Sequence, residues 1–137
     1  MFKLIKILGA RYNAPEIVEI EAELSGNCDA GYFYFLDNYG IFPHTGDETT
    51  NVFVPIETKE GDGSVTRIKG YYVTDDMVFE GKLYGSVDAL YVGAPVSAHV
   101  NDGLVLDGIS GSSGEFARIM SIEDYEATGN VTFRLVI

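Results

Sequence analysis

The stretch Glu16-Ile17-Val18-Glu19-Ile20-Glu21-Ala22-Glu23-Leu24 decides the fold class of this chain. Its even-numbered positions from Val18 to Leu24 are apolar, and three glutamates stand between them. A period of two is the pattern of a half-buried β-strand. The stretch also fits a short helix that starts at Pro15. The β-branched residues favour the strand, so we predict a β-strand here.

Short apolar segments separated by turn residues follow along the rest of the chain. Turn signals recur about every ten residues, which is typical of a β-sandwich or a small β-barrel. We therefore predict an all-β fold, a single compact domain of about eight to ten short strands. Strands are expected in the segments Phe2–Leu8, Tyr32–Leu36, Asn51–Thr58, Ser64–Thr74, Met77–Tyr84, Ala89–Val92, Val96–Val100, Leu104–Asp107, Glu115–Ile122 and Asn130–Ile137. Residues 37–50 are expected to form a loop, and Asn101-Asp102-Gly103 is a hairpin signal.

Composition limits the class of protein. The chain has 137 residues, of which 46% are hydrophobic, so it is long and apolar enough to bury a core. One cysteine excludes an internal disulfide. A net charge of −12 disfavours a surface that binds nucleic-acid phosphates or anionic lipid. The sequence contains no run of about 18 apolar residues, which is the length that a membrane-spanning helix needs. We expect neither nucleic acid nor a membrane among the partners.

Positive charge gathers at the start of the chain. Residues 1–12 carry Lys3, Lys6 and Arg11 and no acid, which leaves 6 basic and 21 acidic residues in 13–137. The sequence therefore predicts a basic N-terminal strand or arm, 1–12, on an acidic β domain, 13–137. Two interpretations stay open. The segment either grips an acidic surface on a partner protein, or it is an edge strand whose lysines discourage unwanted pairing.

Aromatic residues cluster between positions 32 and 42. Tyr and Phe are enriched at protein interfaces, and alternate members of a strand face opposite sides. The members that we assign to an oligomer or partner interface are Tyr32, Tyr34, Tyr39 and Phe42. The alternative is that the whole cluster fills the core.

The sequence motifs that could support catalysis or bind a phosphate or a metal ion are weak. The Gly-rich run 108–114 lacks the lysine of a phosphate-binding loop. His44 and His99 have no neighbouring ligands at zinc spacing. Cys28 precedes Asp29, and an adjacent acid raises a thiol pKa. No carboxylate group matches a calcium loop. We expect no catalytic residue, no metal, no cofactor and no enzymatic activity.

The box Arg11-Tyr12-Asn13-Ala14-Pro15-Glu16 follows the short basic segment, and it resembles the start of small capsid decoration proteins of tailed bacteriophages. These are also called head-stabilising or cement proteins. Their middle part is similar to Tyr72–Glu80, where a strand ends in an acidic turn and a new strand begins. Their C-terminal part is similar to Tyr91–Val96, Asp102-Gly103, Gly114–Ile119 and Thr128–Leu135.

The resemblance implies a non-enzymatic virion protein, made in the bacterial host cytoplasm, that stabilises the outer surface of the assembled capsid. Its partners would be the major capsid protein and further copies of itself, with a trimer as one form. The residues expected to contact the capsid are Phe2, Lys3, Lys6, Arg11 and Tyr12. Alternative hypotheses are a tail- or head-fibre-associated module that binds receptors or glycans, and a small hydrolase. For the hydrolase, no nucleophile–base pair stands out.

Overall fold

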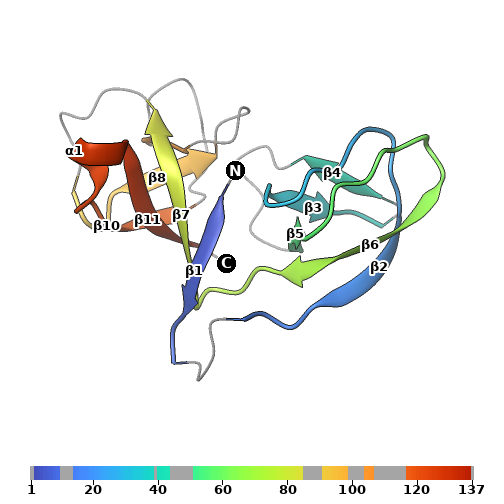
Figure 1. Ribbon diagram of the computed structural model, residues 1–137, viewed down its shortest axis with the longest axis horizontal. Coiled ribbons are helices and arrows are strands. Elements are labelled where there is room, and N and C mark those ends of the chain that lie inside the picture. The colour runs from blue at the N-terminus through green and yellow to red at the C-terminus, as the bar shows by residue number, and fades with distance from the viewer. Residues whose placement is uncertain are drawn as a thin grey trace.

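The computed structural model describes residues 2–9, 14–38, 40–43, 51–84, 91–98, 104–106 and 117–136 (Figure 1). Within these ranges the regular elements are eleven strands and one helix of four residues, which confirms the predicted all-β class. The elements are β1 Lys3–Ile7, β2 Val18–Glu23, β3 Tyr34–Leu36, β4 Ile41–Pro43, β5 Val52–Pro55, β6 Val65–Tyr72, β7 Met77–Tyr84, β8 Pro95–Ala98, β9 Leu104–Leu106, β10 Ala117–Ser121, α1 Tyr125–Thr128 and β11 Asn130–Leu135.

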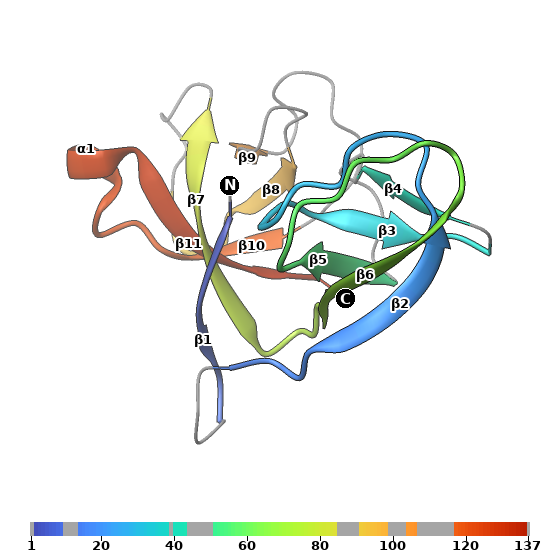
Figure 2. The same cartoon turned by 45° about the vertical axis from the view of Figure 1, so that its right-hand side comes forward.

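The strands form two sheets that lie beside each other (Figures 1 and 2). Sheet A has the order β1-β7-β11-β10-β8-β9, and β9 also pairs with β7 in parallel. Sheet B has the order β2-β6-β5-β3-β4. The remaining strand pairs that the structure describes are antiparallel. The two sheets do not close into a single barrel, so the barrel alternative is corrected.

A shared core joins the two sheets. From sheet A it takes the inward side chains of β7, β10 and β11, among them Phe79 and Phe133. From sheet B it takes Val52, Val54 and Tyr71. All four residues of β5 are buried because its two faces meet two different cores, as expected for a continuous apolar strand.

A second core lies within sheet B alone. It gathers apolar side chains from β2, β3, β4, β5 and β6, centred on Phe53 and Ile68, both fully buried. Sheet B curls around this cluster, because an isolated bridge joins Glu23 to Gly40 and brings the end of β2 to the start of β4. The open side of this curled sheet, which we call its mouth and which lies between β2 and the turn that joins β3 to β4, is therefore a candidate site.

The strand interpretation of Glu16–Leu24 is confirmed. In β2 the apolar positions point to the second core, and the glutamates are exposed. The glutamates meet basic residues across the sheet, since Glu21 lies opposite Arg67 and Glu19 opposite Lys69. The Arg67 guanidinium is 3.2 Å from Glu21 and 3.8 Å from Glu19. Exposed pairs of this kind contribute about 0–1 kcal/mol each.

Two local predictions are wrong. Tyr91 and Val92, expected at the end of a strand, lie in a turn that Gly93 completes with a φ of 91°. The expected loop 37–50 contains β4, which is held by its pairing with β3. The expected hairpin turn at 101–103 and the Gly-rich run 108–114 lie outside the described residues, although β8 and β9 do pair antiparallel.

Candidate functional site

The basic N-terminal segment begins as the edge strand of sheet A. Among the strands that the structure describes, β1 pairs with β7 alone, and its register places Lys3 opposite Glu80 and Lys6 opposite Val78. The register shifts between Leu4 and Lys6, which is a β-bulge or irregularity in β1. Because Val78 and Glu80 are two residues apart, this shift brings both lysines to the same face of the sheet.

The side chain of Phe2 lies in the shared core, with 5% of its surface exposed. Its ring centroid is 4.5 Å from that of Phe33 and 5.6 Å from that of Phe133. A Cβ atom at Gly81 would lie 2.7 Å from the Phe2 ring, so only glycine leaves room for it. The expectation that Phe2 contacts a capsid is therefore corrected: its apolar ring is taken up by the core.

The other residues expected to contact the capsid fall into two groups. Lys3 and Lys6 are exposed, as a surface contact requires. Arg11 and Tyr12 lie outside the described residues.

The aromatic cluster is mostly internal. Tyr34 is 5% exposed in the second core, and its hydroxyl accepts a hydrogen bond of 2.7 Å from the Asp29 amide. Tyr32 is partly buried against the same core. Phe42 is 38% exposed, and its ring packs beside that of Phe35. Tyr39 lies outside the described residues. Tyr34 is thus corrected to a core residue, while Phe42 stays at the surface.

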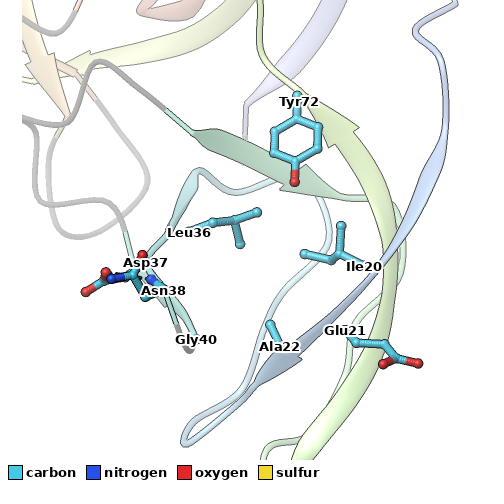
Figure 3. A pocket seen from close by; sticks show the side chains of 8 residues that line it. All are labelled: Ile20, Glu21, Ala22, Leu36, Asp37, Asn38, Gly40 and Tyr72. Carbon is cyan, nitrogen blue, oxygen red and sulfur yellow. Dashed lines mark hydrogen bonds between the residues drawn. The ribbon is translucent and has the colours of Figure 1, made fainter.

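An open groove lies at the mouth of sheet B, between β2 and the turn that joins β3 to β4 (Figure 3). Its volume is about 290 Å³. Ile20, Ala22, Leu36 and the ring of Tyr72 point into it, whereas the carboxylate of Glu21 points away (Figure 3).

The groove combines one exposed aromatic ring with polar side chains at its rim. Tyr72 is 42% exposed, and its ring is fixed against Phe53 with centroids 5.4 Å apart. The turn at Asp37 is closed by a backbone bond from its amide to the Gly40 carbonyl. Asn38 and Asn51 line the same region. This set can stack on one face of a ligand and bond its polar groups. Sequence reasoning missed Tyr72, because nothing in its neighbourhood distinguishes it from Tyr71.

A second depression, of about 240 Å³, lies on the outer face of sheet A. Arg118, Met120, Arg134, Leu135 and Val136 line it. Arg118 and Arg134 stand directly opposite each other in the β10–β11 register. Sequence reasoning missed both arginines, since they are 16 positions apart and only the pairing of two strands joins them.

Burial raises the pKa of three titratable groups among the described residues. Cys28 is fully buried, and burial together with Asp29 raises the pKa of its thiol to about 12. Burial raises the pKa of Tyr34 and of Tyr71 to about 12 as well. All three groups are therefore neutral at pH 7, and the Cys28 thiol is a poor nucleophile there.

Among the described residues, no three His, Cys, Asp or Glu side chains gather as ligands for a metal ion. His44 and His99 lie outside these residues. The described part of the chain also contains no helix long and apolar enough to cross a membrane.

Comparison with known proteins gave no match to a family model, a curated protein or a solved structure.

Proposed function

We propose that the protein is a non-enzymatic structural protein of a phage virion, which binds the outer surface of the assembled capsid and stabilises it. The resemblance described above suggests this class, and the major capsid protein is then the partner. A protein that binds only the assembled lattice stabilises it by linkage. Repetition over the shell, with self-association of the bound copies, adds avidity.

The observation that carries the proposal is the position of Lys3 and Lys6. β1 is an edge strand, and its two exposed lysines share one face of sheet A. The burial of Phe2 fixes the start of this strand to the core. A rigid basic edge loses less conformational entropy on binding than a flexible arm does. It also suits carboxylates on a partner protein, while the acidic remainder of the chain faces solvent and keeps particles apart.

Co-sedimentation tests the proposal. Purified protein is mixed with mature capsids of its own phage, and separately with unassembled capsid protein. We expect it to pellet with the capsids and not to bind the free subunits. Failure to bind mature capsids would overturn the proposal.

Charge reversal locates the contact. The double substitution Lys3→Glu/Lys6→Glu is compared with Lys59→Glu/Lys69→Glu, which changes the net charge equally, at Lys69 on β6 of sheet B and at Lys59 in an isolated bridge to Cys28. We expect the first pair to weaken capsid binding about tenfold or more, and the second to have little effect. Equal effects would mean that net charge, and not the β1 edge, governs binding. Deletion of residues 1–12 is a poorer test, because it also removes Phe2 from the core.

The groove of sheet B favours a second candidate function. An exposed tyrosine ring beside Asp37, Asn38 and Asn51 is suited to a sugar, whose C–H face packs on an aromatic ring while its hydroxyls meet amides and carboxylates. The protein would then be a tail- or head-fibre-associated module that binds a receptor glycan.

A glycan array tests this second function. We expect binding to be abolished by Tyr72→Ala and kept by Tyr91→Ala, which removes an exposed tyrosine far from the groove residues in sequence. An array without hits would argue against the glycan function. Immunogold labelling of virions, at the head or at the tail, decides between the two functions.

A further inference from the structure

Sheet B ends on one side at β2, and this edge is open among the strands that the structure describes. β2 pairs with β6 from Val18 to Glu23 without a register shift. Its other contact within the described part of the chain is the isolated bridge from Glu23 to Gly40 at one end. β2 also contains no proline. Bulges and prolines are devices that keep further strands away from an edge, so this edge stays regular enough to accept one.

The backbone groups of alternate residues point to the open side of β2. Leu24, directly after the strand, donates its amide to the Ser64 carbonyl at 3.2 Å, so its backbone faces the side of β6. In an antiparallel pair every second residue exchanges backbone bonds with the partner strand. Counting back from Leu24, the amides and carbonyls of Glu19 and Glu21 therefore point away from β6. The bridge from Glu23 lies on that same side and supports the count.

The groove beside this edge is lined by apolar side chains. Ile20, Ala22, Leu36 and the ring of Tyr72 point into it (Figure 3). Ala22 belongs to the second core, and Ile20 and Leu36 pack against that core. A strand laid along β2 would direct every second side chain into the groove and cover these residues. The volume of about 290 Å³ suits a few such side chains.

The outer face of the same edge is acidic. Glu19 and Glu21 are exposed there, and β6 shows which side chains this face accepts. Arg67 lies opposite Glu21 and Lys69 opposite Glu19, with the apolar Ile68 between them. The Arg67 guanidinium contacts Oε1 of each glutamate, and a carboxylate accepts further bonds through its second oxygen. A strand on the open side would meet the same glutamates, so basic side chains at alternate positions suit it as they suit β6.

A second copy of the chain fits this edge poorly. Two β2 strands side by side would bring glutamates against glutamates, and like charges opposite each other destabilise a sheet. The basic edge strand β1 carries a register shift, which interrupts the regular alternation that pairing with β2 requires. The segment that suits the edge therefore belongs to a different protein.

We infer that the open edge of β2 and the groove beside it bind an extended segment of another protein, in which basic and apolar side chains alternate. The segment adds a strand to sheet B by bonding to the backbone of Glu19 and Glu21. Its apolar side chains enter the groove, and its basic side chains meet the two carboxylates. In strand addition the backbone bonds supply affinity, and the sites for alternate side chains supply selectivity. The inference goes beyond the proposed function, which uses the β1 edge of sheet A, and does not depend on it.

Hydrogen exchange of single amides tests the inference. A short peptide of alternating lysine and valine is added to the isotopically labelled protein, and exchange is followed by NMR. We expect the amides of Glu19 and Glu21 to exchange about tenfold more slowly with the peptide, because a new strand covers them. The amides of Ile20 and Ala22, which face β6, should change little. If this alternation is absent up to about 1 mM peptide, the inference is overturned.

Two control peptides separate strand addition from attraction by charge. The first has the same residues with N-methyl groups on the amides that would face β2, and the second has glutamate in place of each lysine. We expect neither to protect Glu19 and Glu21. Equal protection by the N-methylated peptide would show that charge alone draws the peptide to a chain of net charge −12, and this result would also overturn the inference.

A matched pair of variants tests the two carboxylates. Glu19→Gln/Glu21→Gln is compared with Glu123→Gln/Glu126→Gln, which removes two exposed acids at α1. We expect the first pair to weaken binding of the lysine–valine peptide about threefold or more, and the second to leave it nearly unchanged. Equal losses would assign the binding to net charge and contradict the inference.

Two further outcomes would assign the site to another occupant. One is a glycan that shifts the ring signals of Tyr72 while the peptide leaves Glu19 and Glu21 unprotected, which would favour the second candidate function. The other is protection of both amides in the concentrated protein alone, together with a doubled mass, which would assign the edge to a second copy. Capsids do not enter any of these measurements, so the inference and the proposed function can fail separately.

Discussion

Phe2 packs its ring onto Gly81 and between the rings of Phe33 and Phe133. Replacing it by alanine leaves a cavity among aromatic side chains that cannot collapse easily. We expect Phe2→Ala to lower the free energy of unfolding by about 3–5 kcal/mol. Urea denaturation followed by circular dichroism measures this loss.

Phe42→Ala is the control for Phe2→Ala, because the Phe42 side chain is 38% exposed and outside both cores. We expect it to cost less than about 1 kcal/mol. If Phe2→Ala were as mild as the control, Phe2 would be a surface residue and the predicted arm would be restored.

Tyr71 makes stability depend on alkaline pH. Burial raises the pKa of its phenol from 10.0 to about 12, so the folded state holds the proton more tightly than the unfolded state does. This contribution is complete below pH 10 and is lost as the pH rises towards 12. Tyr34 and Cys28 shift in the same direction.

We therefore expect the free energy of unfolding to fall between pH 9 and 12, and to fall less steeply in Tyr71→Phe, which has no phenol to ionise. Urea titrations at a series of pH values measure the slope. An identical slope in the variant would contradict the assignment to Tyr71.

At the scale of elements, β1 is an edge strand of sheet A among the described residues, and it carries two lysines and a register shift. Both features discourage another strand from adding to the edge. We expect Lys3→Val/Lys6→Val to promote self-association at concentrations where the natural protein stays dispersed. Static light scattering over a concentration series measures this change.

Lys69→Val is the control for the Lys3→Val/Lys6→Val variant at the β1 edge. Its strand, β6, is paired with β2 on one side and β5 on the other, so an added apolar residue there has no open edge beside it. Equal association of the two variants would show that lost charge, and not the edge, is responsible.

The elements that could be predicted from the sequence are those whose own pattern determines them. β2 alternates strictly, and β7 was predicted with the observed bounds because the turn at Asp75-Asp76 precedes it. β4 has only three residues and contains Pro43, so its strand state depends on its partner β3. The four-residue helix α1 is equally short, and Gly129 ends it with a φ of 77°.

The candidate sites depended on register, which the sequence does not display. Lys3 and Lys6 are three positions apart, so a regular strand would place them on opposite faces. The shift in β1 brings them together. Arg118 and Arg134 meet only because β10 pairs with β11. The lysines near the start of the chain could be identified from the sequence, but their position on one face of sheet A could not.

At the scale of the whole molecule, the charge asymmetry has a different geometry from the one that the sequence suggested. The sequence divides into a basic segment and an acidic domain. In the fold, Lys3 and Lys6 join three basic residues from β7, β10 and β11, and the strands of sheet B carry an acidic excess. Among the residues of the described strands, the basic excess therefore lies on sheet A and the acidic excess on sheet B.

The shared core makes the two sheets a single cooperative unit. Val52, Val54 and Tyr71 of sheet B pack with Phe79 and Phe133 of sheet A, so neither sheet buries its inner face alone. The second core lies inside sheet B, yet β5 contributes side chains to both cores. Loss of packing in one core therefore destabilises the other.

Two isoleucines allow a matched test of this cooperativity. Ile119 is 1% exposed in the shared core, and Ile68 is 0% exposed in the second core. We expect each Ile→Ala variant to lose about 2–5 kcal/mol in one transition, with coincident far- and near-ultraviolet circular dichroism and an unchanged urea dependence. Two separate transitions in Ile68→Ala would show instead that sheet B unfolds on its own, because the second core would then be lost while the shared core persisted.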